Sequence, residues 1–243
     1  MNTITIAGHD IIIYNDRPVG IIVSGGADSS LMLYVLMEHI KDHLNIYTIF
    51  EPGRREAAEP AIDDSIALCS QLTGKTNFTV HKYDVADQNP ETLFRTVSDK
   101  LESGEVDIMY AGLTKFPPYE MWKDHPEVQP QWHIDARTDE VQKPLFGVNI
   151  PVREDTDFSL LTSGGLPQKE VKSDERLYVP WVNLNKKDIA DMYRVLDVEK
   201  NLFPITRSCE NPGHPITHCN KCFWCAERLW AFGYLDHPDE QLE

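Results

Sequence analysis

The segment Ser24-Gly25-Gly26-Ala27-Asp28-Ser29-Ser30 follows the apolar run at residues 19–23 and precedes a second apolar run at residues 31–37. A short β-branched run next to glycines is typical of a buried strand, and the apolar run that follows predicts a helix. The glycines and serines therefore lie at a strand-to-helix turn. Unpaired N–H groups at a helix N-terminus favour an anion, and glycine lets the backbone approach that anion closely. The segment predicts a phosphate-binding loop.

This loop lacks the lysine of the Gly-x4-Gly-Lys-Ser/Thr loop, which handles the β- and γ-phosphates in phosphoryl transfer. We expect a loop of N–H groups and hydroxyls to hold a pyrophosphate group that later leaves. The predicted nucleotide-binding residues are Ser24, Gly25, Gly26, Ala27, Asp28, Ser29, Ser30 and Gly112. A second Ser-Gly-Gly at residues 163–165 precedes Leu166-Pro167, and we expect it to be only a loop.

The pattern Ser-Gly-Gly-x-Asp-Ser resembles the signature of the PP-loop family of ATP pyrophosphatases. This resemblance implies that ATP is cut between its α- and β-phosphates to adenylate a substrate oxygen. It also implies Mg²⁺ as a cofactor, with Asp28 contributing directly or through water. Asp28 and Ser29 are accordingly predicted catalytic residues.

Four cysteines near the C-terminus follow the spacing Cys-x9-Cys-x2-Cys-x2-Cys; they are Cys209, Cys219, Cys222 and Cys225. Four thiolates suit tetrahedral zinc in a structural site with no open position. An iron–sulfur cluster is the alternative, although the proline that often follows such a motif is absent. The chain shows no secretory signal, so we do not expect disulfides.

Three other residues have the chemistry of metal ligands. His214 and His218 lie in the same loop as spare ligands, and we expect them to be solvated. Cys69 lies alone on a helical apolar face and is predicted to be buried in the core.

The loop and the cysteines together resemble, within the PP-loop family, the 7-cyano-7-deazaguanine synthases. Further local matches lie at residues 178–189, at Thr206-Arg207-Ser208-Cys209 and at residues 225–232, so the similarity covers residues 19–84 and 178–235. The resemblance implies an adenine nucleotide α-hydrolase-like, Rossmann-like fold with a C-terminal zinc segment at residues 205–235. It also implies a homodimer and a role in queuosine biosynthesis.

The similarity fails between the two blocks. The family's Pro-Gly-Arg-Asn and Tyr-Pro-Asp-Cys segments are missing, and residues 115–176 form a long polar stretch dotted with prolines. A stretch of this length is a substrate lid or binding loop, or is disordered. The ATP chemistry therefore transfers more readily than the identity of the substrate.

The resemblance implies a carbon–nitrogen ligase that adenylates 7-carboxy-7-deazaguanine and uses ammonia to form the amide and then the nitrile. Lys186 is the predicted catalytic residue that stabilises phosphate charge, unless it is a solvated helix lysine. Arg54 or Arg55 would hold a phosphate or the substrate carboxylate, or form part of the charged surface. We expect Arg228 to be structural. The alternatives are an enzyme that adenylates another carboxylate, stops at the amide or modifies a protein partner, and a catalytically silent nucleotide-binding protein.

The composition suggests where such a protein works. The chain has 39 acidic and 23 basic residues and a net charge of −16, which argues against a broad nucleic-acid footprint. No apolar stretch has the length needed to span a bilayer, so we expect no membrane partner and a cytoplasmic location. A chain of 243 residues suits one domain.

Hydrophobic patterning predicts one α/β domain with a doubly wound parallel sheet and ligands at the carboxyl ends of its strands. An opening hairpin is expected at residues 3–7 and 11–14. Further strands are expected at residues 20–23, 46–50, 78–83 and 108–112. Helices are expected at residues 29–41, 61–72, 91–102 and 186–196, and from Phe223 onward.

Overall fold

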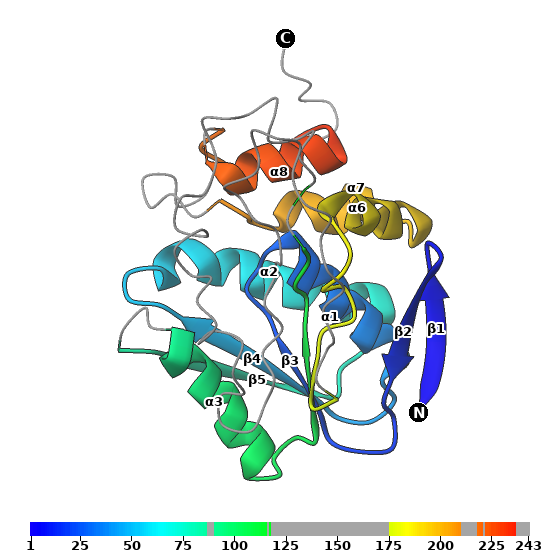
Figure 1. Cartoon of the computed structure of the whole chain (residues 1–243), viewed down its shortest axis with the longest axis vertical. Helices are drawn as coiled ribbons and strands as arrows, with labels where there is room; N and C mark the ends of the chain where they lie inside the picture. Colours follow the sequence, from blue (N-terminus) through cyan, green and yellow to red (C-terminus); the bar gives the residue numbers. More distant parts are fainter. Residues whose placement is uncertain (87–89, 116, 118–174, 210–217, 221, 237–243) are drawn as a thin grey trace, which may run out of the picture.

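The computed structural model describes residues 1–86, 90–115, 117, 175–209, 218–220 and 222–236. A five-stranded sheet lies at the centre of this part of the chain (Figure 1), and every adjacent pair of its strands is parallel. Its strand order is β5-β4-β3-β6-β7. The strands are β3 (Val19–Ile22), β4 (Leu44–Phe50), β5 (Phe78–Asp84), β6 (Ile108–Ala111) and β7 (Leu177–Tyr178).

Helices cover both faces of this sheet, which confirms the predicted α/β class. The helices α1 (Ala27–His39) and α2 (Arg55–Thr73) share one apolar core with the sheet, whereas α3 (Pro90–Glu102) packs into a second core. The chain order reverses between β3 and β6, because β4 and β5 lie on one side of β3 and β6 on the other. In open parallel sheets such a reversal opens a crevice at the carboxyl ends of the strands, where ligands bind.

An antiparallel hairpin of β1 (Asn2–Ile6) and β2 (His9–Ile13) forms a separate two-stranded sheet. The hairpin was predicted, but its turn is shorter than expected. Only Ala7 and Gly8 lie between the strands, at φ 50° and 83°. This geometry matches the right-handed twist of paired strands. Ile11 and Ile13 are fully buried, so the hairpin contributes to the core beside α1.

The C-terminal part consists of short helices above the sheet (Figure 1). These are α6 (Lys186–Val195), α7 (Glu199–Leu202), the 3-10 helix η3 (Phe203–Ile205) and α8 (Phe223–Phe232). Phe203 and Phe232 stack with their ring centroids 3.6 Å apart, and Tyr193 meets both rings edge-on. This aromatic cluster joins α6, η3 and α8 into one unit.

Several boundaries differ from the sequence-based expectation. Helix α2 begins at Arg55 rather than near residue 61, since an ion pair between Arg55 and Glu59 one turn apart supports the early turns ahead of Pro60. The elements β7, α7 and η3 were not predicted. The expected lid at residues 115–176 and the second Ser-Gly-Gly fall almost wholly outside the described residues, and so does His214.

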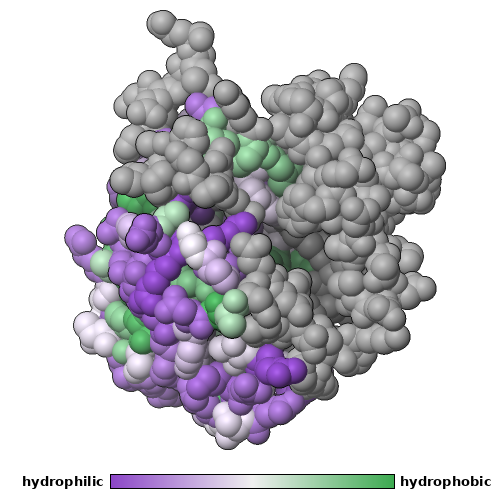
Figure 2. All heavy atoms as spheres, turned by 90° about the vertical axis from the view of Figure 1, so that its left-hand side faces the viewer, coloured by the Kyte–Doolittle hydropathy of each residue, from purple (hydrophilic) through white to green (hydrophobic). Residues whose placement is uncertain are grey.

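One face of the molecule can be described by its hydropathy. Figure 2 shows a face on which the described residues are mostly hydrophilic, with scattered hydrophobic ones. In the part of the chain that the structure describes, no helix combines the length and apolar character needed to cross a membrane.

Candidate functional site

The loop between β3 and α1 brings two glycines and the hydroxyls of two serines to the start of a helix. Gly25 adopts φ 78°, a left-handed conformation that favours glycine, and Gly26 caps α1 without a side-chain hydrogen bond. The Ser24 N–H donates to the Ser29 hydroxyl at 3.2 Å, and that hydroxyl donates to the Gly26 carbonyl at 3.2 Å. The Ser24 hydroxyl lies 3.1 Å from the Ser29 hydroxyl. These hydrogen bonds hold the loop against the first turn of α1, with the hydroxyls of Ser24 and Ser29 side by side.

Gly112 lies directly against this loop. A Cβ at position 112 would lie 2.7 Å from the carbonyl carbon and oxygen of Asp28 and 2.8 Å from the Ser29 nitrogen. Only glycine permits this approach without a backbone shift. The end of β6 and the start of α1 therefore meet at the point where the strand order reverses.

The hydroxyl of Ser30 is directed elsewhere. Ser30 is fully buried and its hydroxyl donates to the Ser65 hydroxyl on α2 at 3.1 Å, while its N–H donates to the Gly26 carbonyl. The expected contribution of this hydroxyl to a phosphate site is not seen. The reason is its place on α1, since Ser30 faces α2 rather than the loop.

Asp28 and Lys186 form a largely buried ion pair, although 158 residues separate them in the sequence. The Lys186 Nζ lies 2.5 Å from Asp28 Oδ2, and the two side chains are 7% and 13% exposed. The Thr114 hydroxyl lies 3.4 Å from the same oxygen and donates to it. Asp28 Oδ1 is buried and has no hydrogen-bond partner among the described residues. Lys186 is therefore not a solvated helix lysine.

Local sequence fixes the position of Lys186. Asn185 caps α6, and its side chain accepts hydrogen bonds from the N–H groups of Lys187 and Asp188. The Asp188 carboxylate accepts in return from the Asn185 N–H at 2.7 Å, which completes a capping box. Lys186 is thus the first residue of a well-capped helix that points its ammonium at the loop.

Two buried residues near the loop, Tyr193 and Glu227, had no predicted role. The Tyr193 hydroxyl donates to the Ala27 carbonyl at 2.8 Å, and complete burial raises the pKa of this phenol, so it stays a donor. Glu227 is 1% exposed, and its Oε2 lies 3.7 Å from Lys186 Nζ. A single acid next to Arg228, in a helix whose other residues are apolar, is the signal that could have identified Glu227.

The two arginines considered for substrate binding contact acids. The Arg55 guanidinium lies 2.9 Å from Glu59 and 2.5 Å from Asp84, and it also lies over the ring of Phe50. Arg54 contacts Glu51 at 2.9 Å. These contacts fit the charged-surface alternative more closely than an arginine held ready for an anion.

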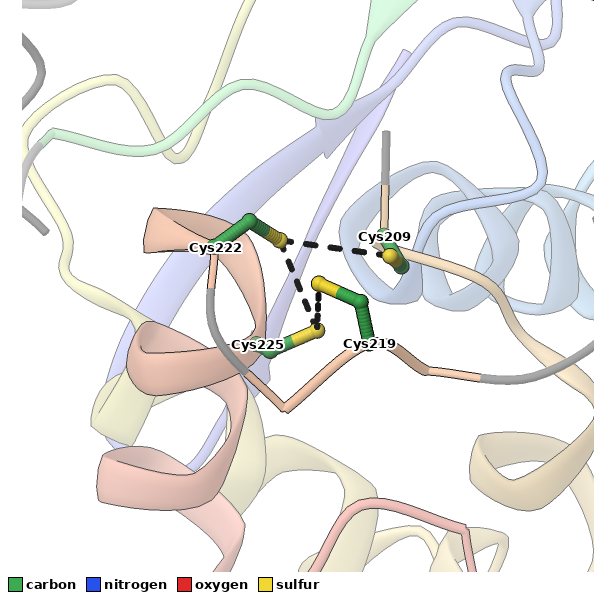
Figure 3. Close-up of side chains that lie close together, drawn as sticks. All are labelled: Cys209, Cys219, Cys222 and Cys225. Carbon is green, nitrogen blue, oxygen red and sulfur yellow. Dashed lines mark hydrogen bonds between the residues drawn. The ribbon is translucent and has the colours of Figure 1, made fainter. Parts of the chain in front are cut away.

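The four cysteines converge from two loops and the start of α8 (Figure 3), and their sulfur atoms all lie within 4.8 Å of one another. Sulfur–sulfur distances are 3.5 Å for Cys222–Cys225 and 3.9 Å for both Cys219–Cys225 and Cys209–Cys222. A tetrahedral zinc with Zn–S bonds of about 2.3 Å requires sulfur atoms about 3.8 Å apart. The cluster therefore fits zinc. Hydrogen bonding, chiefly with Cys225, lowers the pKa of Cys222, and the same contact raises the pKa of Cys225, so Cys222 is the first of the two to be a thiolate.

Two other residues with metal-binding side chains, His218 and Cys69, are both buried, but only Cys69 was predicted to be. His218 was expected to be solvated but is only 9% exposed, and its Nδ1 lies 2.5 Å from Asp236 Oδ1, four residues after α8 ends. Cys69 is fully buried in the core, as predicted, and burial raises its pKa to about 12. Such a thiol is inert as a ligand or nucleophile.

Arg228 anchors α8, in agreement with the expected structural role. It is 1% exposed and lies over the ring of Phe203 at 3.6 Å. Its guanidinium donates to the carbonyls of Leu235 and Phe203 at 2.6 and 2.8 Å and to the Thr206 hydroxyl at 2.8 Å. Arg207, which follows Thr206, donates its backbone N–H to the Gly25 carbonyl at 2.7 Å. Arg207 lies two residues before Cys209, so this hydrogen bond ties the segment that leads to the cysteine cluster to the loop after β3.

The arrangement joins a glycine-rich helix start, a buried lysine and a carboxylate with an unused oxygen at one point of the sheet. Such a set can bind an anion together with a divalent cation. Comparison with known proteins adds no family to this description: no protein-family model matches the chain, and no curated protein matches it significantly.

Proposed function

We propose that this chain is an ATP-dependent ligase of the PP-loop type that releases AMP and pyrophosphate. The observation that supports this most is the convergence of Asp28, Lys186 and Gly112 on the loop after β3. A loop without its own lysine receives one from α6. Such a cation can stabilise charge on the phosphates as the α–β bond breaks.

Chemistry at this site would proceed in two stages. A substrate carboxylate oxygen attacks the α-phosphorus, and pyrophosphate leaves to give an acyl-adenylate. Ammonia then attacks the acyl carbon and displaces AMP, which yields an amide and a proton. In the resembled synthases a second ATP activates the amide oxygen, and loss of AMP gives the nitrile. Bound Mg²⁺ would neutralise phosphate charge, and Asp28 Oδ1 is the carboxylate oxygen that could ligate it.

The resemblance names 7-carboxy-7-deazaguanine as the first substrate to test. The second candidate is a ligase that acts on a different carboxylate, which the altered segment at residues 115–176 favours. Homodimer formation, cytoplasmic location and one domain over residues 1–243 belong to the same proposal, as does structural zinc at the four cysteines.

Mass spectrometry of complete and drop-out reactions tests the proposal. The complete reaction contains ATP, Mg²⁺, ammonium and 7-carboxy-7-deazaguanine. We expect a nitrile that requires all four components and disappears in Ser29→Ala, whose hydroxyl lies in the loop. The amide alone would mean that only the first half-reaction occurs. AMP formation with another carboxylate alone would favour the second candidate, and its absence with every carboxylate would contradict the proposal.

A further inference from the structure

Glu227 is a buried acid that the chemistry above does not use. It lies on α8, two residues after Cys225, and is 1% exposed. Its carboxylate lies 3.7 Å from the ammonium of Lys186, which is itself 2.5 Å from Asp28. One lysine therefore lies between two carboxylates that come from different helices.

The two carboxylates are not equivalent. Asp28 is part of the loop and is hydrogen-bonded to Lys186, whereas Glu227 is farther from the lysine and belongs to the helix that begins at the cysteine cluster. A buried ammonium that loses its only counter-charge is strongly destabilised. A second carboxylate within ion-pair distance removes this penalty when the first one is engaged elsewhere.

We propose that Glu227 is a positioning residue that retains the Lys186 ammonium at the phosphate loop when Asp28 also binds Mg²⁺ through Oδ1 and shares its charge with the metal. This inference rests on the proposed function, because it assigns Asp28 to the metal and Lys186 to the phosphates. Without Mg²⁺, Asp28 holds Lys186. With Mg²⁺ and ATP, Glu227 supplies the counter-charge from behind the lysine. The cysteine cluster then helps to position Glu227 beside Lys186, since it fixes the start of the helix that carries Glu227.

Glu227→Gln separates this role from a merely structural one, because the amide keeps the size of the side chain and removes its charge. Calorimetry would measure ATP binding with Mg²⁺ and with EDTA. We expect Mg²⁺-ATP binding to weaken by about tenfold, as for outer-shell partners of metal sites. Binding of ATP in EDTA should change by less than about threefold, because Asp28 still holds Lys186 there. Glu227→Asp keeps the charge and should show a smaller loss with the same dependence on Mg²⁺.

Asp191→Asn is the matched control, since this exposed acid pairs with Arg194 on the helix that carries Lys186. It should leave both affinities unchanged. Equal losses with and without Mg²⁺ in the Glu227 variants, or no loss in either condition, would overturn the inference. If Glu227→Gln does not fold, Glu227→Asp decides by the same comparison.

Calorimetry and the measurement of AMP together keep the two proposals apart. A wild-type protein that binds Mg²⁺-ATP but forms no AMP with any carboxylate would contradict the proposed function and leave the binding comparison decisive for Glu227. A wild-type protein that forms AMP while Glu227→Gln binds Mg²⁺-ATP normally would contradict the role of Glu227 alone. Failure of the wild type to bind ATP in either condition would overturn both.

Discussion

At the scale of single residues, the site depends on two contacts: the close approach of Gly112 to the backbone of Asp28, and the ion pair of Asp28 with Lys186. Gly112 lets β6 touch the first turn of α1, and Lys186 reaches the same turn from α6. Neither contact is local in the sequence. Each can be tested by removing one side-chain property while the rest of the fold stays intact.

Gly112→Ala should lower both stability and ATP affinity. Its Cβ would meet the backbone of Asp28 at 2.7 Å, so the loop must shift, at about 2 kcal/mol of unfolding free energy. Gly104→Ala is the control: its φ of 72° is strained for alanine, but nothing lies within 4 Å of the added Cβ. We expect it to cost about 1 kcal/mol and to leave ATP affinity unchanged. Urea unfolding and calorimetry check both, and wild-type ATP affinity in Gly112→Ala would contradict the close approach.

Lys186→Met should destabilise the protein by about 3 kcal/mol, because it leaves Asp28 and Glu227 as buried charges without the ammonium. Adding Asp28→Asn should restore part of that loss. The double-mutant cycle should show a coupling of about 1 kcal/mol or more in urea unfolding. The exposed pair of Asp191 and Arg194 should couple by less than about 0.5 kcal/mol in the same experiment. Additive effects at Lys186 and Asp28 would mean that the ion pair does not form in solution.

At the scale of elements, α8 links the cysteine cluster to the loop. It begins at Phe223 beside the cysteines, carries the buried Glu227 and Arg228, and packs against α6 through Phe232. The cluster fixes the start of a helix of only 10 residues, which is short for stability on its own. Loss of the metal should therefore affect the whole C-terminal unit.

Purified protein should contain about one zinc per chain by elemental analysis. Removal of zinc by a chelator should lower the free energy of unfolding by about 3 kcal/mol or more, a fraction of the roughly 10 kcal/mol that structural zinc can supply. Cys225→Ser should lose the metal, whereas Cys69→Ala should keep it, because Cys69 lies in the main core. Iron with acid-labile sulfide in place of zinc would contradict the assignment and favour the iron–sulfur alternative.

At the scale of the molecule, the sequence was sufficient to predict the parallel sheet, its helices and the cysteine cluster, since these follow from local hydrophobic patterns and from spacing. It did not predict β7, which has two residues and exists only because Met109 and Tyr110 pair with it. The partner of Asp28 could not be derived either, because a sequence does not show which distant lysine the fold brings near. The contact of Glu227 with Lys186 was missed for the same reason. Ser30 was grouped with the phosphate ligands because the sequence does not show that its side chain faces α2, where its hydroxyl bonds Ser65.

The central claim is cleavage of ATP between its α- and β-phosphates at the loop after β3. Phosphorus NMR of zinc-loaded protein with Mg²⁺-ATP, ammonium and 7-carboxy-7-deazaguanine tests it most directly, with further carboxylates in parallel. The account predicts AMP and pyrophosphate in equal amounts, dependent on a carboxylate and abolished in Asp28→Asn. ADP with inorganic phosphate, or intact ATP with every carboxylate in a folded protein that holds its metal, would contradict it.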